Sequence, residues 1–443
     1  MTTIPQVGQS MQVILQETAQ SLGRTSGFVQ RQSPFGGAEL VQTLVFGWLA
    51  NPQASLEALT QTAAALGVSL SAQGLDQRLG ERAAEFLQQV LQQAVQQLVQ
   101  ADKVPLSVWA HFSGVYVQDS TTVTLPADLA EVWPGCGGGH TPGDGAAALK
   151  VQVQWELQSG QLSAVELQAG RAADRTAGEW LAHVPAGALV LADLGYFSLE
   201  RMAAQAAAGS YWLTRVQAGT SLVDADGQHW PLSAWLADQT ATQVDCPIRL
   251  GVEHQLPCRL LAVRVTPAVA AERRRQLRAE ARRRGQAVSA ERLKLADWTV
   301  FVTNVPADWL PLEQAWVLAR VRWQIELLFK LWKSHGQLDE WRSRKPWHIL
   351  CEVYAKLLGQ LVQHWILLVS CWDRPDRSLV KAAQTIRQHA LHLASAFDQP
   401  AAFEQALRVV QRCLAHGCRL NKRRGDPSTY QRLAAFDLAH ALA

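Results

Sequence analysis

The sequence predicts an α/β protein in which a mixed β-sheet is flanked by helical regions at both ends of the chain. Three observations support this fold class. Much of the first hundred residues follows a 3.6-residue apolar period, residues 106–216 alternate between strand-like and helix-like segments, and residues 346–443 are mostly helical in pattern. We therefore expect a helical region over residues 1–105, an α/β region over 106–345 and a second helical region over 346–443.

The N-terminal region contains a predicted helix-turn-helix. An apolar-periodic helix over about 55–66 stops at Gly67, and a second helix begins near Ser71. Three polar side chains of this second helix could face a DNA groove, namely Gln73, Gln77 and Arg78. A longer amphipathic helix follows over Arg82–Gln100. Because helices joined by a glycine are common in any bundle, DNA contact and purely structural packing both remain open for this segment.

The first predicted strands lie between residues 115 and 167. Val115–Asp119 is a short apolar run that ends in an acid. The glycine-rich loop over 133–145 lacks the Lys-Ser/Thr of a nucleotide-binding P-loop and is expected to be a connector. Leu149–Leu157 alternates strictly, as a half-buried strand does, and Leu162–Leu167 returns after a turn. These two segments predict a hairpin.

The remaining core elements alternate between helix and strand. A helix over about 174–183 leads to the apolar strand Ala188–Asp193, and a helix over about 197–208 leads to the strand Tyr211–Val216. Residues 217–297 interrupt this rhythm with short β-like pieces and an Arg-rich helix over 272–284. The strand Trp298–Thr303 then resumes the core, and a helix is expected over Leu318–Lys333.

Composition narrows the class of protein. With 443 residues, of which 48% are hydrophobic and 18% charged, the chain can bury a large core. The longest apolar stretch, 357–372, is interrupted by Gln360, Gln363 and His364, so no transmembrane helix is predicted. The N-terminus resembles no secretory signal, and the seven cysteines show no repeated pair spacing. We therefore expect reduced thiols and a cytoplasmic protein.

Charge is distributed unevenly behind the net +3. Residues 1–269 carry 13 Lys/Arg against 22 Asp/Glu, whereas residues 270–345 carry 16 against 9 and residues 371–443 carry 11 against 6. Of the 41 basic residues 32 are Arg, whose guanidinium pairs with phosphate through two parallel hydrogen bonds. The basic stretches favour a polyanionic partner, with nucleic acid first. A solvated basic surface is the alternative.

Three acids are candidates for metal binding. Asp119 and Asp193 each end a predicted strand, and two such carboxylates on adjacent strands can bind divalent cations, which prefer hard oxygen ligands. Strand-end aspartates are also common in turns. In the helix over 318–333, Glu326 is the sole acid among Arg320, Arg322, Lys330 and Lys333. At ~100° per residue, Arg322, Glu326 and Lys333 follow one stripe, which suits a metal ligand flanked by phosphate-binding side chains. Salt bridges at i, i+4 are the simpler interpretation.

Four stretches together carry a family resemblance. They are VYVQDSTTVTLP around Asp119, ADLGYF around Asp193, WTVFVTNVPADWL at 298–310 and RWQIELLFKLWKS at 322–334. With them the chain resembles the family-four insertion-sequence transposases, the cut-and-paste DDE group that includes the transposon-five enzyme. Arg322, Glu326 and Lys333 match the Arg-Glu-Lys signature of that family. Its usual Tyr, three residues before the Arg, is Ala319 here.

The resemblance implies an RNase H-like catalytic core with a β-rich insertion at about 217–297. It implies that Asp119, Asp193 and Glu326 hold two Mg²⁺ ions, for which Mn²⁺ can substitute. DNA contacts are expected from the basic residues of the same helix, namely Arg320, Arg322, Lys330 and Lys333. In the insertion, Trp230, Trp235 and Trp298 are expected either to stack on DNA bases or to belong to the core.

The expected activity is DNA cleavage at the ends of a mobile element followed by strand transfer into target DNA. The expected partners are double-stranded DNA, as terminal inverted repeats and target, and a second copy of the chain in a homodimer on paired ends. The N-terminal region is expected to bind DNA, the C-terminal region to include a dimer face, and the protein to associate with a bacterial nucleoid when bound to DNA. The alternatives are an inactive or domesticated DNA-binding protein and a metal-dependent nuclease of the same fold.

Overall fold

The computed structural model describes residues 2–31, 34–104, 106–137, 145–174, 184–283, 285–374 and 376–420, together with residues 432 and 435. The chain divides into two compact units. Unit 1 comprises Met1–Val104, Ser120–Ala172 and Gln324–Asp426, and unit 2 comprises Pro105–Asp119, Ala173–Trp323 and Pro427–Ala443. The division falls inside strand β1 (Val115–Leu125) and at the start of helix α12 (Trp323–Lys330).

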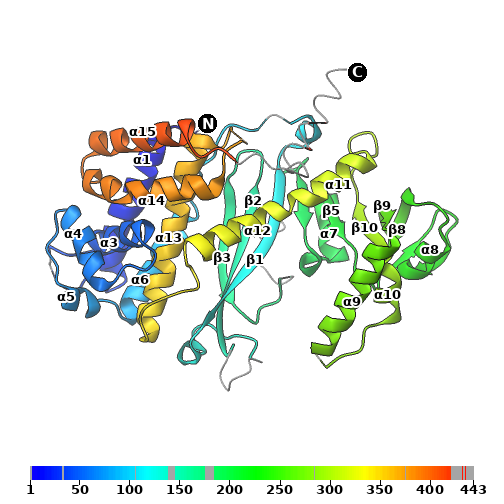
Figure 1. Cartoon of the computed structure of the whole chain (residues 1–443), viewed down its shortest axis with the longest axis horizontal. Coiled ribbons are helices and arrows are strands. Elements are labelled where there is room, and N and C mark those ends of the chain that lie inside the picture. The colour runs from blue at the N-terminus through cyan, green and yellow to red at the C-terminus, as the bar shows by residue number, and fades with distance from the viewer. Residues whose placement is uncertain are drawn as a thin grey trace. The chain divides into compact units, whose positions relative to one another are not determined.

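Unit 1 is organised around the helix α13 (Pro346–Cys371), which is buried along nearly its whole length (Figure 1). A helix that is apolar on all sides takes such a central position because every face can then be covered. The helices that contact it are α1 (Ile4–Gln12), α3 (Gly37–Ala50), α6 (Glu81–Ala94), α14 (Leu379–Ala396) and α15 (Pro400–His416). The N-terminal part is completed by the π-helix η1 (Val13–Thr18) and by α2 (Ala19–Thr25), α4 (Leu56–Ala65) and α5 (Ala72–Asp76).

The three predicted N-terminal helices are confirmed in place, and α4 agrees with the helix expected over about 55–66. The prediction that Gln77 and Arg78 lie on the second helix is wrong, because α5 ends at Asp76. Ser71 caps the second helix of the predicted helix-turn-helix, because its side chain accepts a hydrogen bond from the Gly74 N–H, yet α5 has only five residues. The helix predicted over Arg82–Gln100 ends at Ala94. The chain beyond it leaves the helix to bond elsewhere, since the Ala101 N–H donates to the Ser159 carbonyl at 2.8 Å.

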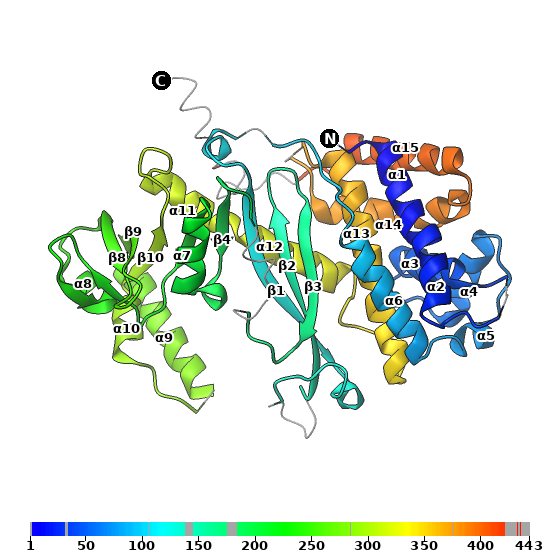
Figure 2. The ribbon, with the colours of Figure 1, turned by 180° about the vertical axis from the view of Figure 1, so that it is seen from behind.

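The predicted hairpin is confirmed as β2 (Ala147–Glu156) and β3 (Leu162–Ala169), which pair antiparallel (Figure 2). In unit 1 the strand order is β3-β2-β1. The prediction of a half-buried strand is wrong for β2, which is buried along its whole length. Neighbouring side chains cover part of its polar face: Gln152 donates from Nε2 to Oε1 of Gln168, and Oε1 of Gln154 accepts a hydrogen bond from Ser163. In the part of the chain that the structure describes, the Nε2 of Gln154 is buried without a hydrogen-bond partner.

Unit 2 contains a mixed sheet in the order β1-β4-β5-β10-β9-β8-β6-β7. The strands β4 (Leu189–Ala192) and β5 (Tyr211–Arg215) run parallel to β1, and helix α7 (Leu199–Ala207) forms the crossover between them. The other strands pair antiparallel: β10 (Trp298–Thr303), β9 (Leu256–Arg264), β8 (Gln243–Leu250), β6 (Ser221–Val223) and β7 (His229–Pro231). The predicted α/β class with a mixed sheet is therefore confirmed. The helix expected over about 174–183 lies almost entirely outside the described residues.

Residues 217–297 add their own small core to unit 2. They contain β6 to β9 and the helices α8 (Leu232–Asp238), α9 (Pro267–Arg283) and α10 (Ala290–Leu295). Trp298 is only 5% exposed and belongs to this core, against which Trp230 and Trp235 pack. Of the two roles expected for these tryptophans, the structure supports core packing.

The helix predicted over Leu318–Lys333 is divided into three pieces. Helix α11 (Leu312–Val321) ends before a turn at Arg322, α12 follows, and the π-helix η7 (Leu331–His335) closes the segment. The widened last turn is closed by the Gly336 N–H, which donates to the Leu331 carbonyl at 2.9 Å. Among the described residues, no helix is both long and apolar enough to cross a membrane.

Candidate active site

Asp119 and Asp193 follow paired positions on two adjacent parallel strands. Gln118 of β1 lies opposite Ala192 of β4, so the next residue of each strand is an aspartate. Parallel strands are about 4.8 Å apart, and the two side chains therefore start from the same level of the sheet. Asp119 remains inside β1, whereas Asp193 precedes the short 3₁₀ helix η6 (Leu194–Tyr196). Both side chains are partly exposed.

Arg322 joins the two carboxylates. Its Nη1 lies 3.3 Å from Oδ2 of Asp119, and its Nε lies 3.9 Å from Oδ1 of Asp193. The side chain of Arg322 is 21% exposed, which makes the pairs less screened than surface ion pairs. One guanidinium can approach both carboxylates only if they face a common space. Unit 2 therefore brings Asp119, Asp193 and Arg322 together, although Arg322 was expected to contact DNA.

Glu326, the third predicted acid, lies in the first turn of α12 and is partly buried. Its neighbours Trp323 and Leu327 are 56% and 42% exposed, so this part of the helix presents apolar surface to solvent. Among the described residues, no group of three or more His, Cys, Asp or Glu side chains is arranged to hold a metal ion. The paired carboxylates of unit 2 are nevertheless donors that fit a divalent cation, because both are hard oxygen ligands that remain partly open to solvent.

The other predicted DNA-binding cations divide into two groups. Lys333 donates a hydrogen bond from Nζ to the carbonyl of Thr122, on the part of β1 that belongs to unit 1, at 2.7 Å. Lys330 and Arg320 are exposed. In this structure Arg322 and Lys333 therefore have protein partners, whereas Lys330 and Arg320 face solvent.

Two cations, the buried Lys356 and the partly buried Arg387, contact the end of the segment that carries Glu326 and Lys333. Lys356 of α13 donates from Nζ to the carbonyls of Gln337 and Glu340 at 3.0 and 2.7 Å, and it forms an ion pair with Glu352 at 2.8 Å. Arg387 of α14 donates to the carbonyl of His335. Gln337 has a φ of 49°, in the left-handed region that favours glycine, so its conformation depends on such contacts.

Sequence reasoning missed these cations. The side chains of Lys356 and Glu352 are 2% and 6% exposed, and burial lowers the pKa of Lys356 and raises the pKa of Glu352. Burial also lowers the pKa of Arg387. A signal for the pair was present, because Glu352 and Lys356 are an i, i+4 pair of opposite charges in an otherwise apolar helix.

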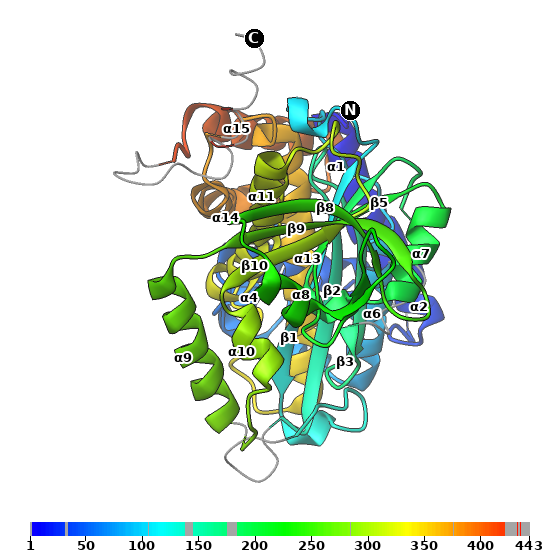
Figure 3. The same cartoon turned by 90° about the vertical axis from the view of Figure 1, so that its right-hand side faces the viewer.

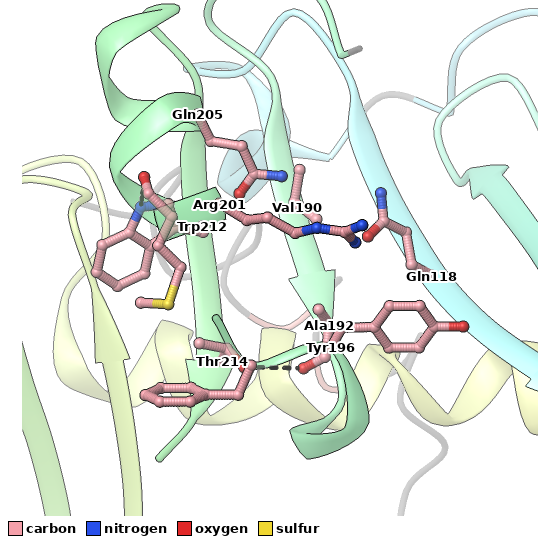
Figure 4. Close-up of a pocket in the computed structure, with 10 residues that line it drawn as sticks. Gln118, Val190, Ala192, Tyr196, Arg201, Gln205, Trp212 and Thr214 are labelled. Carbon is pink, nitrogen blue, oxygen red and sulfur yellow. Dashed lines mark hydrogen bonds between the residues drawn. The ribbon is translucent and has the colours of Figure 1, made fainter. Parts of the chain in front are cut away.

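A small cavity lies behind the two aspartates in unit 2 (Figure 4). It has a volume of about 30 Å³, and its lining includes Gln118 and Ala192, the residues that precede Asp119 and Asp193. Arg201 of α7 extends toward Gln118, and Thr214 donates a hydrogen bond to the Ala192 carbonyl at 3.2 Å. The cavity has room for about one water.

A mixed sheet that presents two carboxylates on adjacent strands is typical of enzymes that act on phosphodiesters with divalent metal ions. Residues 110–360 match the family described as the transposase DDE domain. This match covers more than half of the chain, which therefore belongs to the DDE transposases and is a transposase enzyme. Membership implies that it acts on DNA and, in general, that it depends on divalent metal ions.

Three similar proteins match between 59% and 95% of the chain. It is 26% identical over 450 residues to the transposase for insertion sequence element IS231E of Bacillus thuringiensis subsp. finitimus, which covers 95% of this chain and 91% of the relative. The chain is 28% identical over 378 residues to the transposase for IS231F of Bacillus thuringiensis subsp. israelensis. This match covers 80% of this chain and 78% of the relative. The chain is 25% identical over 287 residues to the transposase for IS1151 of Clostridium perfringens. This match covers 59% of this chain and 58% of the relative.

Proposed function

We propose that the chain is a cut-and-paste transposase of the family-four group with an RNase H-like catalytic core. It cleaves DNA at the terminal inverted repeats of its own element and joins the freed 3′ ends to target DNA. The observation that carries this proposal is the cluster in which Arg322, at the end of α11, pairs with Asp119 and Asp193 of two adjacent parallel strands. The antiparallel hairpin β2–β3 and the parallel set β1, β4 and β5 are also consistent with an RNase H-like core.

The proposed metal ligands are Asp119, Asp193 and Glu326, which would hold two Mg²⁺ ions, with Mn²⁺ as a substitute. When bound, the two ions supply an activated water and stabilise the leaving oxygen. The donor set fits this role because it consists of carboxylates, two of which start from one level of the sheet. Backbone pairing of β1 with β4 holds these two acids at a fixed spacing.

The proposed roles of the basic residues follow from their contacts. Arg322 neutralises Asp119 and Asp193 in the free protein and transfers its two-pronged guanidinium to a DNA phosphate in the complex. Lys333 exchanges the Thr122 carbonyl for a phosphate, as a point charge. Lys330 and Arg320 are already exposed to solvent and add sequence-independent attraction.

The proposed organisation of the chain assigns a function to each region. Residues 1–105 bind DNA through the α4–α5 segment, residues 106–345 carry catalysis, and residues 346–443 contribute a dimer face in a homodimer on paired ends. The protein works in a bacterial cytoplasm and associates with the nucleoid through DNA. The names of the relatives, all transposases of bacterial insertion sequences, support this assignment.

Removing single carboxylates tests the proposal. Asp119→Asn, Asp193→Asn and Glu326→Gln should each abolish cleavage of end DNA in Mg²⁺ while binding of the same DNA in a gel shift stays largely intact. Asp308→Asn is the matched control, because Asp308 is an exposed acid of unit 2 outside the cluster. Near-wild-type cleavage by any of the three variants would exclude that residue as a ligand. Cleavage without joining would instead identify a nuclease.

A further inference from the structure

Helix α9 has an inner face that holds it to the rest of unit 2 (Figure 3). Ala270 is buried, and Arg273 donates to the Trp298 carbonyl at 2.9 Å and to Oγ1 of Thr299 at 2.8 Å. Arg274 donates to the Leu293 carbonyl of α10 at 3.1 Å and forms an ion pair with Asp297 at 2.5 Å. These two arginines bind protein groups, and their role is structural.

The outer face of α9 carries a second set of arginines with a different environment. Arg275, Arg278 and Arg282 follow the i, i+3, i+7 spacing of one helix face, and all three are exposed together with Arg283. Arg275 is 78% exposed and pairs with Glu272 at 2.6 Å. Within the described residues, no ion pair engages Arg278, Arg282 or Arg283. From 267 to 297 the chain carries nine Lys/Arg against four Asp/Glu.

The chemistry of this face indicates a polyanion. Like charges three or four residues apart destabilise a helix by roughly 0.2–0.5 kcal/mol per pair, so folding alone does not favour such a series. Val269 is the large apolar side chain most exposed on α9, at 43%, and the face therefore lacks the apolar stripe that a lipid surface or a helical protein partner needs. From Arg275 to Arg282 the helix rises about 10 Å, a length of duplex DNA that carries about six phosphates.

We propose that the outer face of α9, formed by Arg275, Arg278 and Arg282, binds the sugar-phosphate backbone of duplex DNA without reading its sequence. This proposal rests on the proposed transposase function and extends it to a DNA-binding surface that is separate from the predicted metal ligands. Donor DNA that flanks the element and target DNA share this chemistry. Each arginine neutralises one phosphate and releases the counterions that the phosphate had held.

The test uses the full-length protein and a random-sequence 30-bp duplex that contains no element end. The variant Arg275→Gln/Arg278→Gln/Arg282→Gln should lower the slope of log K against log salt by about 3, at ~0.9 per phosphate. Between 50 and 200 mM salt the wild type should therefore lose about 40-fold more affinity than the variant. The variant Arg275→Lys/Arg278→Lys/Arg282→Lys should keep the wild-type slope, because it keeps the charge.

The matched control removes the same net charge from three separate elements. Arg24→Gln/Arg249→Gln/Arg412→Gln changes three exposed arginines of α2, β8 and α15. If the α9 variant keeps the wild-type slope, or changes it no more than this control does, the proposal is wrong. Because random-duplex binding requires no cleavage, this result is independent of whether the carboxylate variants lose activity.

Two further arms identify the DNA that occupies the surface. An affinity loss that appears only on end duplexes extended by 20 bp of flank would assign α9 to donor DNA. Unchanged end binding with reduced capture of a target duplex by pre-cleaved complexes would assign it to target DNA. If flanked-end binding and target capture are both unchanged while the salt slope on the random duplex falls, the surface acts in non-specific DNA binding. That outcome still agrees with the proposed contact to the sugar-phosphate backbone.

Discussion

The chemistry of single residues is clearest at Arg322. Two carboxylates that start from neighbouring strands repel each other when both carry a charge. The guanidinium that lies 3.3 Å from one and 3.9 Å from the other offsets this repulsion. A divalent cation offers the same compensation, so Arg322 and a metal ion compete for the same two acids.

This competition predicts an unusual variant. Arg322→Gln should bind Mg²⁺ about 3- to 10-fold more tightly than the wild type in the absence of DNA, because each partly exposed ion pair that the metal must replace is worth up to ~1 kcal/mol. The same variant should cleave DNA more slowly, since the proposed phosphate contact is lost. Calorimetric titration with Mg²⁺ measures the affinity. Arg320→Gln is the control, and equal or weaker Mg²⁺ binding by Arg322→Gln would show that Arg322 does not compete with the metal.

His364 predicts a pH dependence of stability. Its Nε2–H donates to the Gly160 carbonyl at 2.7 Å, and the rings of Trp155 and Trp372 lie about 6 Å away. Burial lowers the pKa of His364 to about 4. The unfolded chain takes up this proton near pH 6.5, so the neutral histidine stabilises the fold fully above pH 6.5, and the contribution is lost as the pH falls through 4.

Neutral His364 is expected to contribute about 3 kcal/mol to the free energy of unfolding, because each unit of pKa shift corresponds to about 1.36 kcal/mol. His364→Gln keeps a hydrogen-bond donor but has no proton to take up. Urea denaturation at pH 7 and pH 4 should therefore show that the wild type loses about 3 kcal/mol more than the variant. Equal losses would mean that the site opens to water before His364 titrates.

Ala319 provides a gain-of-function prediction. It lies in α11, one turn before Arg322, where the resembling family has Tyr. A hydroxyl here would be ~4.5 Å along the axis from Arg322, within reach of a phosphate adjacent to the one that Arg322 is proposed to bind. Ala319→Tyr should therefore raise the yield of strand transfer from pre-cleaved ends in Mg²⁺. A variant that is equal to or slower than the wild type would mean that no phosphate contact is missing.

At the scale of elements, the end of η7 shows how distant helices decide a local conformation. Apolar periodicity predicts one helix from 318 to 333, but the structure has a turn at Arg322 and a π-helix after Lys330. The carbonyl of His335, the last residue of the π-helix, accepts a hydrogen bond from Arg387, and the carbonyls of Gln337 and Glu340 beyond it accept hydrogen bonds from Lys356. Because these donors come from α13 and α14, no pattern within residues 318–340 could have predicted the change.

Lys356 should therefore act as a positioning residue for the helix that carries Glu326. Lys356→Met leaves Glu352 buried and unpaired, at a cost of roughly 3–5 kcal/mol. The double variant Glu352→Leu/Lys356→Met should recover much of that stability, because both charges are removed. It should still cleave at least 10-fold more slowly per folded molecule, since the carbonyls of Gln337 and Glu340 remain without their donor.

Thermal denaturation and single-turnover cleavage measure the two effects separately. Leu361→Ala is the matched control, because Leu361 is buried on the same helix and its truncation costs ~2–5 kcal/mol without touching η7. This control should keep its cleavage rate below its melting temperature. Recovery of both stability and rate in the double variant would make the role of Lys356 purely structural.

At the scale of the whole molecule, the hydropathy pattern of the sequence predicted most helices and strands. It did not predict which of their side chains other parts of the chain bury. Alternation located the β2–β3 hairpin, yet it suggested solvent for Gln152 and Gln154, which are buried and hydrogen-bonded to the side chains of Gln168 and Ser163. A hydropathy pattern reports the polarity of a face and not the groups that later cover it. For the same reason the Arg82–Gln100 helix was predicted too long, since its last residues leave the helix before a contact with residues 158–159.

The candidate site was predictable in its acids and not in its ion pairs. Strand-end position identified Asp193, but the prediction that Asp119 also ends its strand is wrong, because β1 continues to Leu125. The parallel pairing of Gln118 with Ala192 still brings the two acids to one level of the sheet. Arg322 is separated from Asp119 by 203 residues, and no local period could associate them. Lys356 was missed because no local pattern places its Nζ beside the carbonyls of Gln337 and Glu340.

The order in which unit 1 is assembled from the chain has a consequence for protein synthesis. Helix α3, nearly all of it buried, packs against α13, which begins almost 300 residues later. A ribosome that adds ~5–20 residues per second therefore exposes the N-terminal helices for about 15–60 s before their partner exists. During this interval nascent chains offer apolar surface to chaperones and proteases. Messages truncated before residue 346 would therefore give short-lived products that do not accumulate to compete with the intact enzyme.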